Sequence, residues 1–264
     1  MAESDPVFIW APTQRCGTGL LQRLVTSSRE VLVFGEERHL TLELPAQMLH
    51  CARPMADQSA LREKLASGDP SGWYVHVYPP AAAYQNTLIR NFRNLVTLYA
   101  DSAQEHGFGR WGTKYPRFQV REALVLSKLL PEARHLFVYR DIVDVLKSVK
   151  ARGWLPHPEA SATYCTQWAQ GIQSALGTVR DNPRFHIIRY EDLTAQPEAH
   201  LTQLSRFLGV RGMDGAVFSH RPNTPQGQYT PPQPLTAAEL AAVQPIAGSV
   251  RSALGYTSPL QAAG

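Results

Sequence analysis

The feature that most constrains this chain is an alternation of short apolar strands with helical stretches. Four apolar runs rich in β-branched and aromatic residues are each followed by polar or helical sequence. These runs are Pro6–Trp10, Val31–Phe34, Arg134–Tyr139 and Arg184–Arg189. Strands that alternate with helices pair in parallel, and the connecting helices cover both faces of the sheet. We therefore predict a three-layer α/β fold with a parallel sheet.

A long segment of different character separates the second run from the third. Residues from about Thr41 to Gly107 are mostly helical in pattern, with several interrupting prolines, and we interpret them as a helical cap inserted into the α/β core. Gly227–Pro234 contains three prolines in eight residues and predicts an irregular loop, followed by a final helix from about Thr236 to Leu254. Because no repeat is present, residues 1–264 are expected to form one domain.

Composition and charge argue against several classes of protein. With 44% hydrophobic and 18% charged residues, extensive disorder and a coiled coil are not expected. The net charge of +4 suits an anionic ligand, but no Lys/Arg-rich tract indicates nucleic-acid binding. Val7–Pro12 is too short to span a membrane, and the acidic start lacks the basic end of a signal peptide, so we expect a cytoplasmic protein without a membrane partner. Cys16, Cys51 and Cys165 form no CxxC pair, which argues against a disulfide framework and a zinc site.

The first candidate site is the turn that follows the first strand. In Ala11–Leu20, Gly17 and Gly19 allow backbone N–H groups to approach an anion, and the N-terminus of the following helix adds a partial positive charge. Thr18 adds a hydroxyl donor. The Walker A pattern is absent because no lysine precedes a serine or threonine here, and Arg15 is the nearby cation. The turn predicts a phosphate site of an unusual kind, although two glycines also suit a purely structural connection.

The second candidate site follows the strand Arg134–Tyr139. Asp141 can cap the next helix, with Asp144 at the capping-box position. Arg140 at the end of the strand and Ser148 two helical turns later could together hold a second phosphate. The simpler alternative is a capped helix with a surface arginine.

Together these stretches resemble the sulfotransferase superfamily that uses 3′-phosphoadenosine 5′-phosphosulfate. The family segment P-R-S-G-T-T corresponds to Gln14–Gly19, and R-D-x-x-D-V-x-x-S to Arg140–Ser148. Arg189-Tyr-Glu-Asp-Leu193 and Leu254-Gly-Tyr256 look like further family landmarks. The resemblance implies a P-loop-like architecture, no metal, and a product adenosine 3′,5′-bisphosphate. It also implies nucleotide contacts from Arg15, Cys16, Gly17, Thr18, Gly19, Leu20, Arg140, Ser148 and Tyr190.

The chain departs from the family pattern in two places. Cys16 replaces the usual serine, Gly19 replaces a hydroxyl residue, and Gln14 stands where proline is usual. The late nucleotide-binding loop of the family often carries Lys or Arg, whereas residues 222–233 contain neither. There, Gln226, Gln228 or Tyr229 could substitute.

The resemblance also suggests catalytic residues. Phe34-Gly-Glu-Glu37 is similar to the G-E-E segment of tyrosylprotein sulfotransferases, whose second Glu is the catalytic base, so Glu37 is the expected base and Glu36 is expected to point away. Trp111-Gly-Thr-Lys-Tyr-Pro116 resembles the G-x-K-x-P segment of the same branch and suggests that Lys114, with Arg15, stabilises the departing phosphate.

Other groups are possible in these catalytic roles. Cytosolic sulfotransferases use a histidine base, a role open to His39 or His76. Cys16 at a helix N-terminus could be a nucleophile, although no motif places a His or Asp partner beside it.

The expected function is therefore transfer of a sulfonate group to a hydroxyl or amine of a small molecule, sugar or peptide. Two alternatives remain open. A nucleotide or small-molecule kinase with an atypical phosphate loop would turn over ATP with magnesium. A non-catalytic nucleotide-binding module would bind adenosine 3′,5′-bisphosphate without forming a sulfonated product. The sequence does not identify the acceptor or the oligomeric state.

Overall fold

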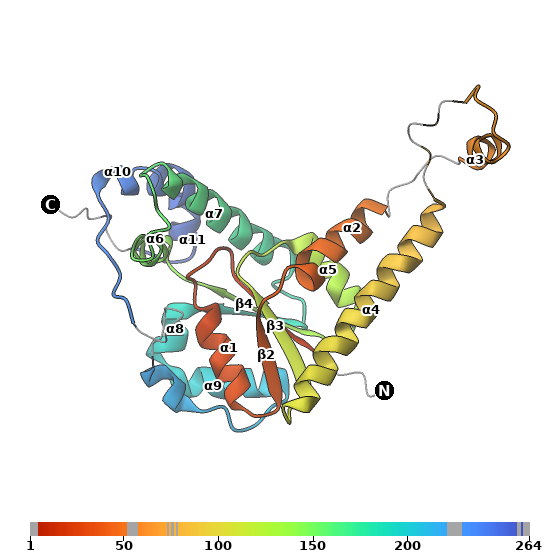
Figure 1. Cartoon of the computed structure of the whole chain (residues 1–264). Coiled ribbons are helices and arrows are strands. Elements are labelled where there is room, and N and C mark those ends of the chain that lie inside the picture. The colour runs from red at the N-terminus through yellow and green to blue at the C-terminus, as the bar shows by residue number, and fades with distance from the viewer. Residues whose placement is uncertain are drawn as a thin grey trace.

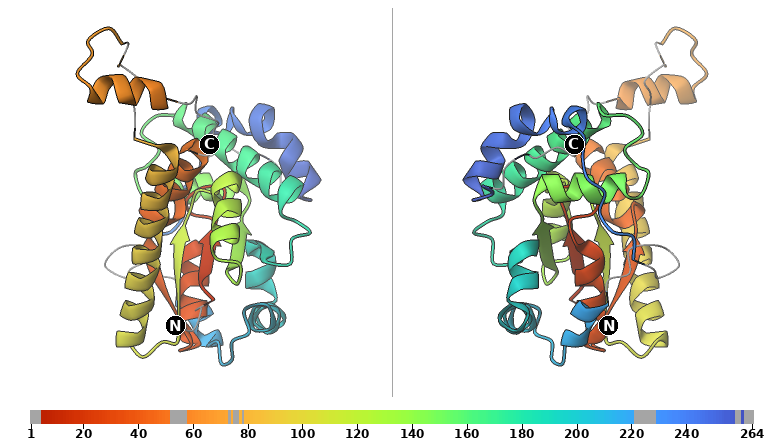
Figure 2. Two further views of the ribbon diagram at one scale, coloured as in Figure 1. Left: turned by 90° about the vertical axis from the view of Figure 1, so that its right-hand side faces the viewer. Right: turned by 90° about the vertical axis from the view of Figure 1, so that its left-hand side faces the viewer.

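The protein is built around a five-stranded parallel sheet, seen in a computed structural model that describes residues 5–51, 58–72, 74, 77, 79–220, 229–257 and 260 (Figure 1). The strand order is β2-β3-β1-β4-β5. The strands are β1 (Val7–Trp10), β2 (Val31–Glu36), β3 (Arg110–Tyr115), β4 (Arg134–Tyr139) and β5 (Phe185–Arg189). All four pairings are parallel, and helices lie on both sides of the sheet (Figure 2), so the predicted α/β class is confirmed.

The helices connect these strands in sequence order. Between β1 and β3 lie α1 (Thr18–Ser27), the π-helical turn η1 (His39–Glu43), α2 (Leu44–Cys51), α3 (Ser59–Ala66) and α4 (Ala81–Glu105). Between β3 and β5 lie α5 (Val120–Leu129), α6 (Ile142–Lys150) and α7 (Ala160–Thr178). After β5 come α8 (Tyr190–Ala195), α9 (Pro197–Leu208), the 3₁₀ turn η2 (Gly215–Ser219), α10 (Ala237–Leu240), the π-helical turn η3 (Val243–Ala247) and α11 (Gly248–Ala253).

The central strand β1 marks the point where the chain changes direction across the sheet. From β1 the chain crosses to β2 on one side, and from β3 it crosses back over β1 to β4 on the other. Since such crossovers are right-handed, helices α1 and α5 lie on opposite faces. A crevice at the carboxyl ends of the strands is therefore expected beside β1, where ligands bind in sheets of this type.

The core explains why the strands read as continuous apolar runs. All four residues of β1 are buried, because both faces of the sheet are covered. The indole Nε1 of Trp10 donates a hydrogen bond to Nδ1 of His135, which lies buried in the neighbouring strand β4. This bond satisfies two polar groups that would be costly to bury unpaired.

Strand β3 was missed by the sequence prediction, which treated Trp111–Pro116 only as a motif. Gly112 and Lys114 weaken its apolar pattern, yet Trp111, Gly112 and Thr113 are buried. A Cβ on Gly112 would lie 2.4 Å from the carbonyl oxygen of Val7 in β1. Glycine at this position therefore permits close approach of the two strands.

The predicted final helix from about Thr236 to Leu254 is also corrected. It is divided into α10, η3 and α11, and Pro245 lies within η3. Proline lacks the backbone N–H of an uninterrupted helix and its ring clashes with the preceding turn, so the helix is broken there.

Candidate active site

The turn between β1 and α1 has a conformation that depends on glycine. Gly17 has a φ of 110°, and Arg15 also has a positive φ, of 69°. A Cβ on Gly17 would lie 2.4 Å from Cδ2 of Tyr190, the first residue of α8. The aromatic ring at the end of β5 therefore packs directly on the turn that follows β1.

The N-terminus of α1 faces this turn without a side chain to cap it. The N-cap residue is Gly17, and the first turn of the helix consists of Thr18, Gly19 and Leu20. The carbonyl of Gly17 accepts the N–H groups of Leu20 and Leu21. Uncapped N–H groups and the helix dipole together favour an anion at such a helix end.

Residues of the two predicted phosphate sites, which lie far apart in the sequence, are in contact in the structure. Nε of Arg15 donates a hydrogen bond of 3.0 Å to Oγ of Ser148, although 133 residues separate them. The guanidinium of Arg140 lies over the ring of Tyr190, 4.8 Å from its centroid. Residues from the β1–α1 turn, α6 and α8 thus meet at one end of the sheet.

A third arginine, which sequence reasoning missed, completes an arginine cluster of Arg15, Arg140 and Arg152. The guanidinium groups of Arg15 and Arg152 lie 5.9 and 5.6 Å from the ring centroid of the half-exposed Trp154. The signal for Arg152 was its spacing, because it follows Ser148 by four residues, about one helical turn.

The cluster is rich in positive charge. Burial chiefly, and then the charges of Arg152 and Arg140, lower the pKa of the Arg15 guanidinium. Arg140 has a long ion pair of 3.8 Å with Asp144. Among the described residues, the buried Nε atoms of Arg140 and Arg152 have no hydrogen-bond partner. An anion bound here would supply acceptors and relieve the repulsion between the arginines.

Two residues near the end of the chain, Arg251 and Tyr256, help to fix the segment next to Arg140. Nε and Nη2 of Arg251 donate to the two carboxylate oxygens of Asp141, both at 2.9 Å, and both side chains are buried. Asp141 caps α6 by accepting the N–H of Val143, as predicted. Glu191 accepts the backbone N–H of Asp141 and the hydroxyl of Tyr256, both at 2.9 Å. Asp141, the residue after Arg140, is therefore fixed through its side chain by Arg251 and through its backbone by Glu191.

The two glutamates after β2 have different partners. Oε1 of Glu36 accepts a bond of 3.0 Å from Nζ of Lys114, a largely buried lysine in β3, and the charge of Glu36 also acts on Arg15. The expectation that Glu36 points away is therefore wrong. The register between β2 and β3 shifts between Phe34 and Glu36, so the strict alternation of side chains fails there.

Glu37 lies between the end of β2 and the start of η1. Its two carboxylate oxygens accept the backbone N–H groups of His39 and Leu40, each at 2.7 Å. Each carboxylate oxygen has more than one lone-pair direction, so an additional donor can still be accepted. The carboxylate is thus held in one orientation at the carboxyl end of the sheet.

Of the two candidate histidines, only His39 can be placed. Its Nδ1 lies 2.6 Å from a carboxylate oxygen of Glu43, and its side chain is exposed. His76, Gln226 and Gln228 lie outside the described residues. Tyr229 is described and is exposed.

Cys16 is fully buried, and burial raises the pKa of its thiol to about 12. This thiol remains protonated near neutral pH, so the structure does not support a nucleophilic Cys16.

Two further findings concern metals and membranes. Within the described ranges, His, Cys, Asp and Glu side chains form no group of three or more that could hold a metal ion. In the part of the chain that the structure describes, no helix combines the length and the apolar character needed to cross a membrane.

Two solved structures share the fold over nearly the whole length of both chains. A sulfotransferase domain from the curacin biosynthetic pathway has a TM-score of 0.55 and 16% identity, covering 97% of this chain and 99% of its own. A sulfotransferase domain from the Synechococcus PCC 7002 olefin synthase has a TM-score of 0.52 and 17% identity, covering 98% of each chain. No curated protein sequence matches the chain. The model of the sulfotransferase family matches residues 6–214.

Proposed function

Because the chain belongs to the sulfotransferase family, we propose that it transfers a sulfonate group from 3′-phosphoadenosine 5′-phosphosulfate to a hydroxyl or amine of a small molecule, sugar or peptide. The observation that carries this proposal is the hydrogen bond between Arg15 and Ser148, which brings the two predicted phosphate sites together. A donor with phosphates at both its 3′ and 5′ positions needs two such sites side by side.

The proposed nucleotide site has two halves. The backbone from Cys16 to Leu20, at the N-terminus of α1, would bind the 5′-phosphosulfate. The 3′-phosphate would accept hydrogen bonds from Arg140 and Ser148 and from the adjacent Arg152. Tyr190, which packs on Gly17 and Arg140, would hold the two halves together.

The proposed reaction is an in-line displacement at sulfur. Glu37 accepts the proton of the acceptor hydroxyl as its oxygen forms a bond to sulfur, and the bond from sulfur to the bridging phosphate oxygen breaks. Arg15 and Lys114 stabilise the negative charge that develops on the departing phosphate. The bond from Lys114 to Glu36, whose charge also acts on Arg15, would orient the ammonium group until the donor binds.

The donor is tested by ligand binding in the absence of magnesium. Adenosine 3′,5′-bisphosphate at 100 times its dissociation constant should stabilise the protein by about 2.7 kcal/mol, measured from its thermal unfolding. Arg140→Ala should weaken this binding by roughly 1.5–3 kcal/mol, the range for a hydrogen bond to a charged group, and should barely change binding of adenosine 5′-phosphosulfate. Equal stabilisation by magnesium-ATP would indicate a kinase, and binding without any sulfonated product would indicate a non-catalytic module.

The base is tested by three single substitutions. Glu37→Gln should retain nucleotide affinity and lower turnover by about 10²- to 10⁴-fold, the usual contribution of a positioned general base. Glu36→Gln should lower turnover less than Glu37→Gln does, because it changes only the carboxylate that orients Lys114. Near-normal turnover of Glu37→Gln beside a large loss in Glu36→Gln or His39→Ala would assign the base to the residue whose variant is inactive.

A further inference from the structure

We propose that the acceptor binds in a groove between η1–α2 and α4, and that it is an uncharged amphiphile in which a hydroxyl-bearing head group is joined to an aliphatic chain. This inference rests on the proposed sulfotransferase function and specifies its substrate class. The acceptor groove is defined by the residues that line it: His39, Leu44, Asn91, Asn94 and Leu95. Its volume is about 390 Å³.

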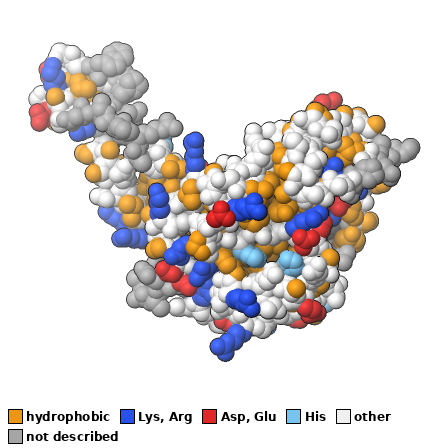
Figure 3. All heavy atoms as spheres, turned by 180° about the vertical axis from the view of Figure 1, so that it is seen from behind, with side chains coloured by type: hydrophobic (Ala, Val, Ile, Leu, Met, Phe, Trp, Pro, Cys, Tyr) orange, Lys and Arg blue, Asp and Glu red, His pale blue; other side chains and the backbone are white. Residues whose placement is uncertain are grey.

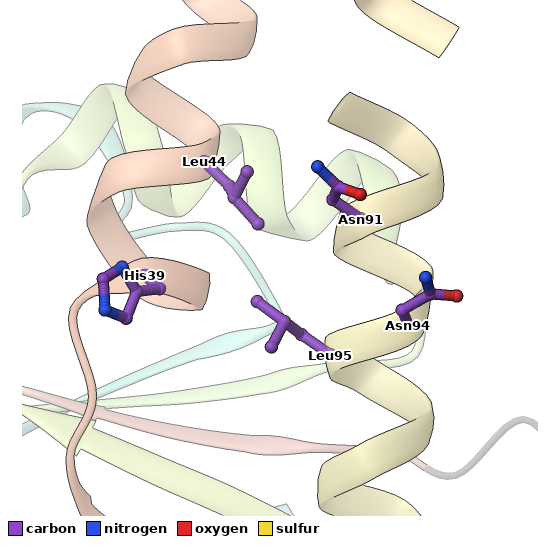
Figure 4. Close-up of a pocket in the computed structure, with 5 residues that line it drawn as sticks. All are labelled: His39, Leu44, Asn91, Asn94 and Leu95. Atoms are coloured by element: carbon purple, nitrogen blue, oxygen red, sulfur yellow. The ribbon is translucent and has the colours of Figure 1, made fainter. Parts of the chain in front are cut away.

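The shape of the groove suits a chain-like ligand. Leu44 and Leu95 point into the space from opposite walls, and Asn91 lies one turn along α4 from Leu95 (Figure 4). Seen from behind, the space-filling view shows a broad hollow between the projecting arm and the body of the protein, with hydrophobic side chains among the atoms that border it (Figure 3). The leucines offer an apolar surface, and the carboxamides offer both donors and acceptors.

The groove adjoins the proposed base. The carboxylate of Glu37 is bonded to the backbone of His39, which lines the groove, and to that of Leu40. The negative charge of Glu37 also acts on Tyr99, which follows Leu95 by one turn of α4. Glu37 therefore lies near both walls, so an acceptor hydroxyl at this end of the groove would be close to the group that removes its proton.

The lining contrasts in charge with the arginine cluster. Of the five lining residues, His39 alone is ionisable, and it is in contact with Glu43. Arg15, Arg140 and Arg152 surround the nucleotide end instead. This separation favours an anionic donor at one end and an acceptor without negative charge at the other, because an anionic group in the groove would lie near the carboxylates of Glu37 and Glu43.

An apolar surface continues along α4 beyond the groove. Tyr84 and Leu98 have exposed fractions of 49% and 61%. Together with Asn91 and Leu95 they recur at intervals of seven, four and three residues, so they share one face of the helix. This face extends about 21 Å at 1.5 Å per residue, which is long enough for an extended aliphatic chain.

The test uses n-octyl β-D-glucoside below its micelle concentration, with methyl β-D-glucoside as the chain-free probe and n-octyl β-D-glucuronide as the charged one. Binding is measured by calorimetry in the presence of adenosine 3′,5′-bisphosphate, and sulfonation by mass spectrometry with the sulfonate donor. The octyl glucoside should bind at least tenfold more tightly than the methyl glucoside, since burial of two methylene groups suffices for that ratio. It should also gain one sulfonate group. Equal binding of the two glucosides, or tighter binding of the glucuronide, would overturn the proposal.

Matched substitutions on α4 then locate the site. Leu95→Trp should fill the groove and weaken octyl glucoside binding about tenfold, whereas Thr97→Trp introduces the same side chain at an exposed position outside the lining and should change nothing. Adenosine 3′,5′-bisphosphate should bind both variants normally, which also shows that they fold. If the unmodified protein fails to bind this nucleotide, the proposed function itself is wrong. If the nucleotide binds and Leu95→Trp leaves octyl glucoside binding unchanged, only the acceptor groove is wrong.

Discussion

The ion pair between Arg251 and Asp141 leads to a quantitative prediction about stability. Arg251→Met removes the guanidinium but retains much of the apolar stem, so packing changes little. Asp141 would keep the bond from the N–H of Val143 but would lose two bonds of 2.9 Å from the guanidinium. The exposed fractions of the two side chains are 5% and 9%, so water can replace few of the lost contacts.

Removing one partner of a buried pair costs about 3–5 kcal/mol, because the remaining charge stays buried without compensation. We expect a loss of this size in the free energy of unfolding of Arg251→Met. The control is Lys147→Met, which removes the ion pair to Asp144 on the same helix. Those side chains are 36% and 43% exposed, and exposed pairs contribute only about 0–1 kcal/mol.

A double variant separates the charge effect from simple loss of packing. Asp141→Asn combined with Arg251→Met leaves no buried charge, and asparagine still caps a helix well. The double variant should therefore be at least about 1 kcal/mol more stable than Arg251→Met alone. Urea unfolding followed by circular dichroism measures these differences, provided that the dependence on urea concentration is unchanged. The reasoning is refuted if Arg251→Met costs less than about 1 kcal/mol, or if the second substitution recovers nothing.

Three further predictions concern the turn, the core and a thiol. Gly17→Ala should lower stability by about 1–2 kcal/mol in thermal unfolding because of its positive φ, and should displace Tyr190, whereas Gly19→Ala, whose Cβ would meet nothing within 4 Å, should not destabilise the protein. Burial lowers the pKa of His135 to about 3, whereas the unfolded chain binds this proton below about pH 6.5. The free energy of unfolding should therefore fall by about 1.4 kcal/mol per pH unit as the pH falls from 6 to 4. This assignment would be contradicted by a His135→Gln variant whose free energy of unfolding still falls by about 1.4 kcal/mol per pH unit between pH 6 and 4. Cys16 should resist iodoacetamide at pH 8 in the native protein, as measured by peptide mass spectrometry, and rapid native labelling would show that the thiol is accessible.

The sequence predicted the elements whose signals are local. β1 and β4 are buried on both faces, so their apolar runs are continuous and easily recognised. β3 was missed because Gly112 interrupts its apolar pattern. The glycine is needed for the close approach of β1, which exists only once the strands have paired. Periodicity likewise suggested one final helix, although Pro245 divides it.

The site was predictable to a similar extent. Motif spacing brought attention to Arg15, Arg140 and Ser148, but not to the bond between the first and the last. The orientation of Glu36 depends on an irregular register between two strands, which strict alternation cannot reveal. The role of Arg251 depends on packing across 110 residues of chain, and no local pattern carries that information.

The order of the strands also has a consequence during synthesis on the ribosome. β1 is made first, but its two neighbours in the sheet, β3 and β4, end at Tyr115 and Tyr139. At about 5–20 residues per second, translation takes roughly 6–26 s to proceed from the end of β1 to the end of β4. Until β3 is complete, the four side chains of β1 lack both strands that later flank them, and they lack β4 until the end of the interval. Among the strands of the sheet, β1 thus waits longest for its neighbours, and a chaperone that binds Val7–Trp10 would protect this strand from aggregation.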